Sequence, residues 1–324
     1  MNDSREPRMS VVIVTTDTFA AIRRTVECLA RQTARSVLEL VVVSPSLARL
    51  DADAALLAAF GRVVRVEVGS IGSIGPANAE GVRRATAPVV ALAEDHAFPD
   101  PDWAERLIAA HDGPWAAVGP SVCNANPRSA VSRADLLIGY GPWLAPAEAR
   151  EMPFLPGHNT SYKREDLLRF GERLGAMLDA ETLLHWELRA NGQRLWLEPA
   201  ARIAHANFSL WRAWLPAQYH YGRLFAGLRT GGMSRWRRIV YIVGSPLIPA
   251  VRLARTWREA RSRPGHRAPW SCLHALVAGL AMDGMGQMAG YALGTGRAAD
   301  LVARYEFHRA RYVRPEERRE LWPA

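Results

Sequence analysis

The chain has 324 residues, of which 49% are hydrophobic and 23% are charged, and its formal net charge is +9. This composition excludes a disordered or fibrous protein, and the length suits one large globular domain with an extension. The three cysteines are too scattered for a disulfide framework or a zinc cluster, which favours a reducing compartment. No basic and apolar leader precedes the first predicted strand, so the sequence predicts no cleaved signal peptide.

The N-terminal part of the chain alternates between strand and helix patterns. Short β-branched or apolar runs predict strands, and apolar residues at helical intervals predict the helices between them. The predicted strands are residues 9–17, 37–43, 63–68 and 87–93, and the predicted helices are residues 20–33, 50–60 and 77–85. Such alternation is typical of βαβ units, so the sequence predicts an α/β fold with a mostly parallel sheet covered by helices.

The fourth predicted strand ends abruptly in Glu94, Asp95 and His96. Burying even one unpaired charge is costly, so these three side chains cannot all enter the core. In an open α/β sheet, ligands bind at the carboxyl ends of the strands, and acidic residues with a histidine suit a divalent cation that carries a phosphate-rich ligand. The alternative is a solvated turn in which aspartate and the following prolines end the strand.

Several short motifs follow one another along residues 9–210. They are residues 10–17, 32–33, 38–43, 72–81, 94–96 with Pro99, Pro101 and Trp103 after them, 157–164, 181–192 and 199–205. In this order they resemble the motifs of glycosyltransferase family 2, in which residues 94–96 take the place of the DxD motif. The family has the nucleotide-diphospho-sugar transferase fold called GT-A.

The resemblance implies a GT-A domain over residues 1–210 and a role for several of its side chains. Glu94 and Asp95 would hold the ribose of a nucleotide-diphospho-sugar and help to orient a metal ion. His96 would bind that ion directly, and His205 would be a further ligand; the alternative for His205 is a hydrogen-bonded histidine at a strand end. The implied metal ligands are His96, Asp95 and His205. The implied donor contacts are Thr15, Asp17, Glu94, Asp95, His158 and Asn159.

Glu181 lies where the family places the acid that removes the acceptor proton, at the start of a predicted helix. The resemblance therefore implies that Glu181 is the general base and that attack opposite the leaving group inverts the anomeric centre. The helix dipole would hold a carboxylate there in its ionised form. Asp179 is close enough in sequence to take this role instead, or both acids cap the helix. His185 follows one turn later and either orients the base or packs beside Trp186.

The chain departs from the family pattern in ways that affect its ligands. Imidazole is an ordinary ligand for Mn²⁺ and a poor one for Mg²⁺, so His96 in the last position of the motif favours Mn²⁺ over Mg²⁺ as the cofactor. Ser44, Pro45 and Ser46 stand where the family has aspartates that help to hold a uracil. The base of the donor nucleotide therefore stays open.

The last part of the sequence is basic and rich in tryptophan. Residues 207–324 carry 19 lysines and arginines against 7 aspartates and glutamates. The stretch 239–251 is apolar but too short to cross a bilayer, which takes about 20 residues. The stretch 272–294 is long enough but contains His274, Asp283 and Gln287. Tryptophans in this part include Trp211, Trp214, Trp236, Trp257 and Trp270.

Arginines and tryptophans beside short apolar segments favour a helical extension, residues 211–324, that binds an anionic membrane surface. This would place the protein at the cytoplasmic face of the cell membrane. The alternatives are a helical appendage packed on the catalytic domain and a re-entrant or spanning hairpin. Nucleic acid is not a predicted partner, because the arginines flank apolar runs and do not form a continuous polar stripe.

The sequence thus predicts an inverting, metal-dependent glycosyltransferase with a nucleotide-diphospho-sugar donor and a lipid-linked or cell-envelope glycan acceptor, as in bacterial envelope polysaccharide synthesis. Two other functions stay open. A sugar nucleotidyltransferase is expected to have a glycine-rich nucleotide loop with a basic residue directly after the first strand, which residues 15–17 do not supply. A non-catalytic membrane-bound scaffold is compatible with the altered DxD motif.

Overall fold

The chain divides into two compact units in its computed structural model, which describes residues 6–261 and 270–323. Unit 1 consists of the residues up to Cys123 together with Ala147–Ala204. Unit 2 consists of Asn124–Pro146 together with the residues from His205 onward. Each unit therefore combines segments that lie far apart in the sequence.

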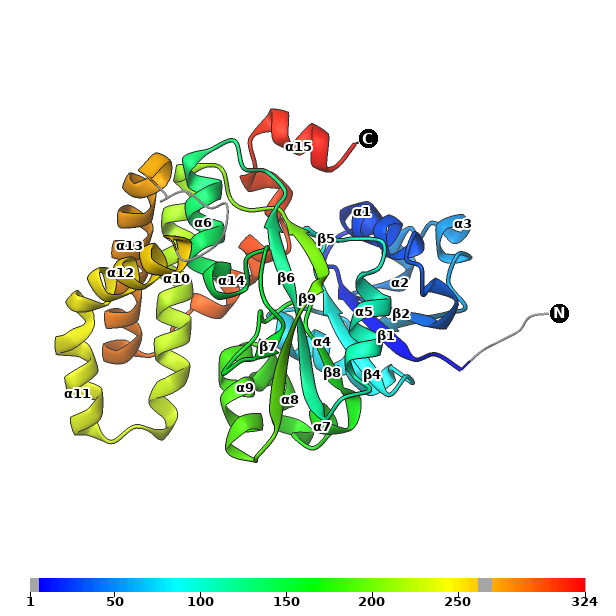
Figure 1. The fold of residues 1–324 in the computed structure, drawn as a ribbon, viewed down its shortest axis with the longest axis horizontal. Coiled ribbons are helices and arrows are strands. Elements are labelled where there is room, and N and C mark those ends of the chain that lie inside the picture. Colours follow the sequence, from blue (N-terminus) through cyan, green and yellow to red (C-terminus); the bar gives the residue numbers. More distant parts are fainter. Residues whose placement is uncertain (1–5, 262–269, 324) are drawn as a thin grey trace. The chain divides into compact units, whose positions relative to one another are not determined.

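Four parallel strands form one half of the sheet (Figure 1). They are β1 (Met9–Val14), β2 (Leu38–Ser44), β3 (Arg62–Glu67) and β4 (Val89–Ala93), in the spatial order β3-β2-β1-β4. The strands β1, β2 and β4 are buried along their whole length, which explains their continuous apolar sequences. Because the strands are parallel, their carboxyl ends lie at the same edge of the sheet.

The other half of the sheet contains antiparallel pairs. The strand β8 (Ser161–Lys163) lies between β4 and β6 (Trp115–Asn124) and is antiparallel to both. Beyond β6 follow β9 (Arg194–His205) and β5 (Ala97–Pro99), and β7 (Arg150–Glu151) pairs with β9. The predicted α/β class is confirmed, and the antiparallel strands add to the parallel half. Because β8 runs opposite to β4, the loop before β8 lies beside the carboxyl end of β4.

Helices cover the sheet of unit 1. The helix α4 (Ile74–Arg84) packs on β1, β2 and β3, and Gly81 permits the close approach, since a Cβ there would lie 2.4 Å from Cγ1 of Val12. The other helices of this unit are α1 (Phe19–Ala30), α2 (Leu47–Leu50), α3 (Ala54–Leu57), α5 (Trp103–Ala110), α7 (Arg164–Leu168), α8 (Leu174–Leu178) and α9 (Glu181–Ala190), with 3-10 turns at Arg35–Val37 and Gly171–Arg173.

The helix predicted over residues 50–60 is wrong in its extent: α2 ends at Leu50, and only the short helix α3 (Ala54–Leu57) lies within the predicted range. Asp51 has φ of 49°, in the left-handed region, and ends α2. Asp53 then caps α3, because its Oδ1 accepts a hydrogen bond from the N–H of Leu56 at 3.0 Å. Two aspartates with turn and cap preferences therefore outweigh the apolar periodicity on which the prediction rested.

Unit 2 is mainly helical. Its helices are α6 (Ala130–Tyr140), α10 (Trp211–Arg229), α11 (Arg235–Gly244), α12 (Ile248–Arg261), α13 (Leu273–Leu293), α14 (Ala298–Glu306) and α15 (Pro315–Leu321), with 3-10 turns at Gly141–Trp143, Thr230–Gly232, Ser245–Leu247, Trp270–Cys272 and Arg309–Tyr312.

Glycines bring α10 and α13 close together. A Cβ on Gly286 would lie 2.0 Å from the carbonyl oxygen of Tyr219, and a Cβ on Gly222 would lie 2.2 Å from that of Asp283. The small residues of the stretch 272–294 therefore serve helix packing, and α13 is a central helix of this unit.

One helix among the described residues, Arg235–Arg261, has the length and apolar composition needed to cross a membrane. It joins α11, a 3-10 turn and α12. Only 11% of its most apolar window is buried. The stretch 239–251, which by itself is too short to cross a bilayer, is thus the middle of a longer helix.

The buried carboxylate of Asp135 on α6 joins this helix to α10 and to the segment before α10. It accepts hydrogen bonds from the indole N–H of Trp214 at 2.7 Å, the side-chain amide of Gln218 at 3.0 Å and the backbone N–H of Phe208 at 3.0 Å. Burial raises the pKa of Asp135 to about 6, and the nearby guanidinium of Arg309 opposes this rise. The carboxylate is therefore ionised at neutral pH and compensated by donors from α10 and from the segment before it.

Replacing Asp135 by alanine leaves three buried donors without an acceptor. We expect Asp135→Ala to lower the free energy of unfolding by about 3–5 kcal/mol. Urea denaturation followed by tryptophan fluorescence measures this loss, because Trp214 is one of the donors. The exposed Asp300→Ala on α14 is the matched control and should stay within about 0.5 kcal/mol of the wild type. Equal stability of the two variants would contradict this role of Asp135.

Candidate active site

Glu94 follows β4 directly, and its side chain is only 2% exposed. The side-chain amide of Asn159 donates a hydrogen bond to its Oε2 at 3.2 Å. Its Oε1 lies 3.6 Å from Nε2 of His96 and 3.6 Å from Nε2 of His158. The buried carboxylate is thus surrounded by groups that offset its charge.

The loop before β8 brings His158 and Asn159 to this carboxylate. Asn159 has φ of 61°, in the left-handed region that asparagine tolerates better than most residues. Its N–H donates to the carbonyl of Leu92 at 2.6 Å, and the N–H of Leu92 donates to the carbonyl of Thr160 at 3.3 Å. The backbone of the loop is therefore held against the end of β4, with both side chains beside Glu94.

Glu181 lies against the same loop from the start of α9. A Cβ on Gly157 would come within 2.7 Å of its carboxyl carbon, so glycine is required for this approach. Its Oε1 lies 3.2 Å from Nε2 of His158, and the side chain is 15% exposed. Burial raises the pKa of Glu181, and the neighbouring His158 opposes this rise.

Asp179 faces a different part of the molecule. Its Oδ1 accepts a hydrogen bond from the N–H of Gly75 at 2.7 Å, and its Oδ2 accepts one from the hydroxyl of Ser73 at 3.0 Å. It therefore caps the N-terminus of α4 and not that of α9, whose start has no side-chain cap. Of the two acids that the sequence offers as a base, Glu181 is the one directed toward His158.

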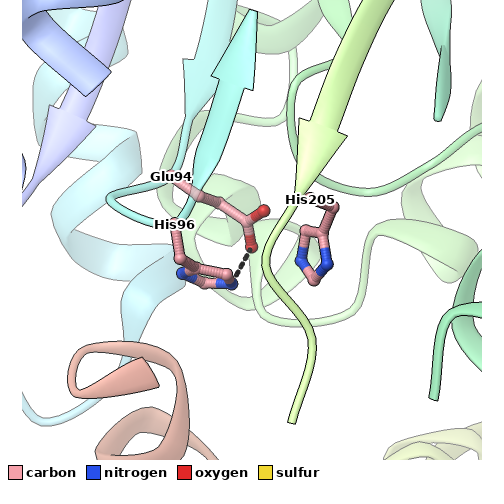
Figure 2. A group of neighbouring side chains, drawn as sticks. All are labelled: Glu94, His96 and His205. Atoms are coloured by element: carbon pink, nitrogen blue, oxygen red, sulfur yellow. Dashed lines mark ion pairs between the residues drawn. The ribbon is translucent and has the colours of Figure 1, made fainter. Parts of the chain in front are cut away.

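Glu94, His96 and His205 form a group of potential metal ligands (Figure 2). Each offers one ligand atom, and these atoms lie within 4.8 Å of one another. His205 is the last residue of β9, the strand whose other residues belong to unit 1. All three residues are buried. A set of one carboxylate and two imidazoles suits a transition-metal dication better than Mg²⁺.

Asp95 is not part of this group, although the family resemblance implies it as a metal ligand. Its Oδ1 lies 2.6 Å from Nδ1 of His96. The carboxylate of Asp95 is thus turned toward the imidazole, and Glu94, which was expected to contact the donor and to help orient the metal, is the acid in the group.

The remaining predicted residues lie outside this cluster. Thr15 and Asp17 follow β1, and the hydroxyl of Thr15 accepts a hydrogen bond from the N–H of Asp17 at 3.2 Å. His185 is fully buried, with Nε2 3.0 Å from the hydroxyl of Tyr162 and Nδ1 accepting from the N–H of Leu155 at 3.3 Å. Burial lowers the pKa of His185 to about 3, so the ring is neutral and donates to Tyr162.

Comparison with known proteins identifies the family. A family model described as Glycosyl transferase family 2 matches residues 10–170. The chain belongs to this family and is a glycosyltransferase with the GT-A type of fold. This result favours glycosyl transfer over the nucleotidyltransferase alternative. The match ends before Glu181 and His205.

Two examples of solved structures that resemble the chain are a mannosyltransferase and TarS. One is the mannosyltransferase PcManGT from Pyrobaculum calidifontis in complex with GDP-Man and Mn²⁺, with 17% identity and a TM-score of 0.45 over 98% of this chain and 84% of that chain. The other is TarS 1–349 from S. aureus in complex with UDP, with 16% identity and a TM-score of 0.46 over 88% of this chain and 91% of that chain. No curated protein sequence matches the chain.

The raised pKa of Glu181 predicts how its removal changes stability with pH. Ionising this carboxyl costs more in the folded protein than in the unfolded chain. The wild type therefore loses stability as the pH rises from the ordinary pKa of glutamate through the raised one. We expect Glu181→Gln to have a higher Tm than the wild type at neutral and alkaline pH, with the difference shrinking in acid.

Differential scanning fluorimetry from pH 5 to pH 8 measures this difference. Glu187→Gln is a control on the same helix, because Glu187 is more exposed and bonds to Arg173 at 2.7 Å. It should show no gain that grows with pH. A Glu181→Gln variant whose Tm never exceeds that of the wild type would be inconsistent with a carboxylate that is costly to ionise.

Proposed function

We propose that this glycosyltransferase is a metal-dependent, inverting enzyme that uses a nucleotide-diphospho-sugar as donor. The observation that carries the proposal is the position of His158. Its Nε2 lies 3.2 Å from Glu181 and 3.6 Å from Glu94. One imidazole thereby links the acid of the metal-ligand group to the acid proposed as the base. The two parts that such a transfer needs, a cation site and a proton acceptor, are adjacent.

The ligand group fits a divalent cation on its chemistry. Glu94, His96 and His205 offer an oxygen and two nitrogens within 4.8 Å, and we propose Mn²⁺ as the ion, with Mg²⁺ as the weaker candidate. A bound Mn²⁺ would offset the negative charge of the donor diphosphate. The hydrogen bond from Asn159 holds the carboxylate of Glu94 in place for this task.

Glu181 is the proposed general base. Its Oε1 lies 3.2 Å from Nε2 of His158 but forms no hydrogen bond of standard geometry within the described part of the chain, so it keeps a lone pair for a proton. Burial raises its pKa toward the range in which a carboxylate accepts a proton more readily at neutral pH. Asp179 does not compete for this role, because both of its oxygens are occupied at the start of α4.

The proposed reaction is a single displacement. The acceptor hydroxyl oxygen forms a bond to the anomeric carbon while the bond from that carbon to the diphosphate oxygen breaks. The hydroxyl proton passes to Glu181, and the nucleoside diphosphate leaves with the bonding electron pair. Attack from the side opposite the leaving group inverts the anomeric centre. Asp95, His158 and Asn159 would contact the donor, and Thr15 and Asp17 at the end of β1 would lie toward its nucleoside.

Glutamine in place of Glu181 keeps the shape of the side chain but cannot accept the proton. We expect Glu181→Gln to lower kcat by about 10²–10⁴ and to leave the affinity for the nucleoside diphosphate nearly unchanged. Release of nucleoside diphosphate measures turnover, and calorimetry measures binding. Asp179→Asn is the matched control. Should that variant lose turnover while Glu181→Gln keeps it, the proposed base is the wrong acid.

The metal proposal predicts a specific loss in His96→Ala. For the wild type, Mn²⁺ together with UDP or GDP should raise the Tm well above the effect of either component alone. This joint effect should disappear in His96→Ala. His111→Ala is the control, because it also removes a buried imidazole, one bonded to Ser161 at 2.9 Å and outside the ligand group. A full joint response in His96→Ala would remove this residue from the proposed site.

The helix Arg235–Arg261 supports the proposal that the acceptor is a lipid-linked or cell-envelope glycan at a membrane surface. Its side chains Trp236 and Val243 are each 73% exposed, and Leu247 is 67% exposed. We call this row the apolar strip. It consists of Trp236, Ile239, Val240, Val243, Leu247 and Val251. Exposed apolar residues with a tryptophan and flanking arginines are typical of a helix that lies in a membrane interface.

Two arginines favour binding along the surface over crossing. Arg252 bonds to Asp283 on α13 at 2.5 Å, and Arg238 donates to the carbonyls of Tyr291 and Ala292. These bonds tie the helix to α13 within unit 2. Between the two arginines, residues 239–251 rise only about 20 Å along a helix, less than the ~30 Å of a hydrocarbon core. The exposed Arg235, Arg237 and Arg258 would meet anionic headgroups.

Binding to anionic liposomes tests this surface. We expect the protein to pellet with them at low salt and to be released as salt approaches about 0.5 M, where charges are screened within a few ångströms. Val243→Ser with Leu247→Ser should weaken pelleting. Val277→Ser, on the exposed part of α13 outside the apolar strip, is the control. Pelleting that resists salt would indicate insertion, and a protein that never pellets would contradict the proposed membrane surface.

A further inference from the structure

The imidazole of His205 is held on one side by a buried asparagine. Its Nδ1 lies 2.9 Å from Oδ1 of Asn207, and Asn207 is fully buried. A neutral imidazole carries its hydrogen on one ring nitrogen and a lone pair on the other. The partner of Nδ1 therefore decides which nitrogen of His205 can serve as a metal ligand.

The orientation of the Asn207 side chain is fixed by a chain of hydrogen bonds that starts at a backbone group. The N–H of Asn126 donates to Oδ1 of Asn124 at 2.9 Å, so this oxygen is an acceptor. The same oxygen accepts from Nδ2 of Asn207 at 3.1 Å, and Nδ2 also donates to the carbonyl of His205 at 3.0 Å. With its amide nitrogen committed to two acceptors, Asn207 must present its oxygen to the imidazole.

A second chain of bonds supports Asn207 from its backbone. Its N–H donates to Oδ1 of Asn126 at 2.8 Å, and its carbonyl accepts from Nδ2 of Asn126 at 2.9 Å. That Nδ2 also lies 3.3 Å from Oε2 of Glu317 on α15, which is buried. The segment 124–126 and the C-terminal helix of unit 2 thus hold Asn207 in one conformation.

We propose that Asn207 is a positioning residue that keeps the hydrogen of His205 on Nδ1 and the lone pair on Nε2, ready to ligate the metal. The inference rests on the metal site of the proposed function and adds the residue that orients one of its ligands. Asp95 stands in the same relation to His96, with its Oδ1 2.6 Å from Nδ1 of that ring. Hydrogen bonds of this kind orient histidine ligands and raise their affinity for metals.

The tautomer is measured without metal by ¹⁵N spectroscopy of the histidines in the full chain, with His205→Gln to assign the signals. We expect the hydrogen on Nδ1 in the wild type and a loss of this preference in Asn207→Ala. A wild-type His205 with its hydrogen on Nε2 would overturn the proposal. This readout does not depend on activity or on metal binding.

Affinity for Mn²⁺ alone, followed by the electron paramagnetic resonance of the free ion, gives the second readout. We expect Asn207→Ala to weaken Mn²⁺ binding about 10–100-fold. Asn207→Asp keeps an oxygen toward Nδ1 and should retain most of the affinity. Ser121→Ala is the matched control, because Ser121 is also fully buried and donates to the carbonyl of Pro199 at 2.8 Å, outside this network. Its affinity should match the wild type.

Wild-type affinity in Asn207→Ala would overturn the proposal, as would an Asn207→Asp variant that folds like the wild type yet binds Mn²⁺ as weakly as Asn207→Ala. A wild type that binds no Mn²⁺ would instead refute the metal dependence of the proposed function. The tautomer of His205 would then still support or overturn the role of Asn207.

Discussion

A carboxylate that is only 2% exposed at the end of a strand must be compensated, and the arrangement around β4 follows from this need of Glu94. Asn159 donates to it from a left-handed backbone conformation, and His96 and His158 place ring nitrogens 3.6 Å away. Gly157 then leaves room for the carboxylate of Glu181, which lies 3.2 Å from the same Nε2 of His158. The conformation of the loop before β8 thus accommodates two carboxylates, those of Glu94 and Glu181.

The two acids at the start of α9 illustrate how environment divides tasks between similar residues. Asp179 uses both oxygens to cap α4 and thereby anchors the end of α8. Glu181, two residues later, faces an imidazole, and its pKa is raised by burial. Asp179 therefore fixes the segment that precedes α9. This leaves Glu181, at the start of α9, as the acid that can accept a proton.

Much of this arrangement could be predicted from the sequence. Periodicity located the strands β1 to β4, and ordered motifs located the family and the end of β4. Hydrogen bonds of individual side chains and contacts between distant segments could not be predicted, because periodicity carries no information about either. Asp95 turns toward a neighbouring ring, Asp51 and Asp53 interrupt an apolar pattern, and α13 uses glycines to pack on α10. Asn207 carries no motif, and only its hydrogen bonds reveal its position.

The most direct test of the account is the position of the metal. A crystal grown with Mn²⁺ and a nucleoside diphosphate, measured at the manganese absorption edge, would show the ion as an anomalous peak. We expect one peak, bound by Glu94, His96 and Nε2 of His205 and contacted by the diphosphate. A peak coordinated by Asp95 in place of Glu94, or one that leaves His205 outside its ligands, would contradict it.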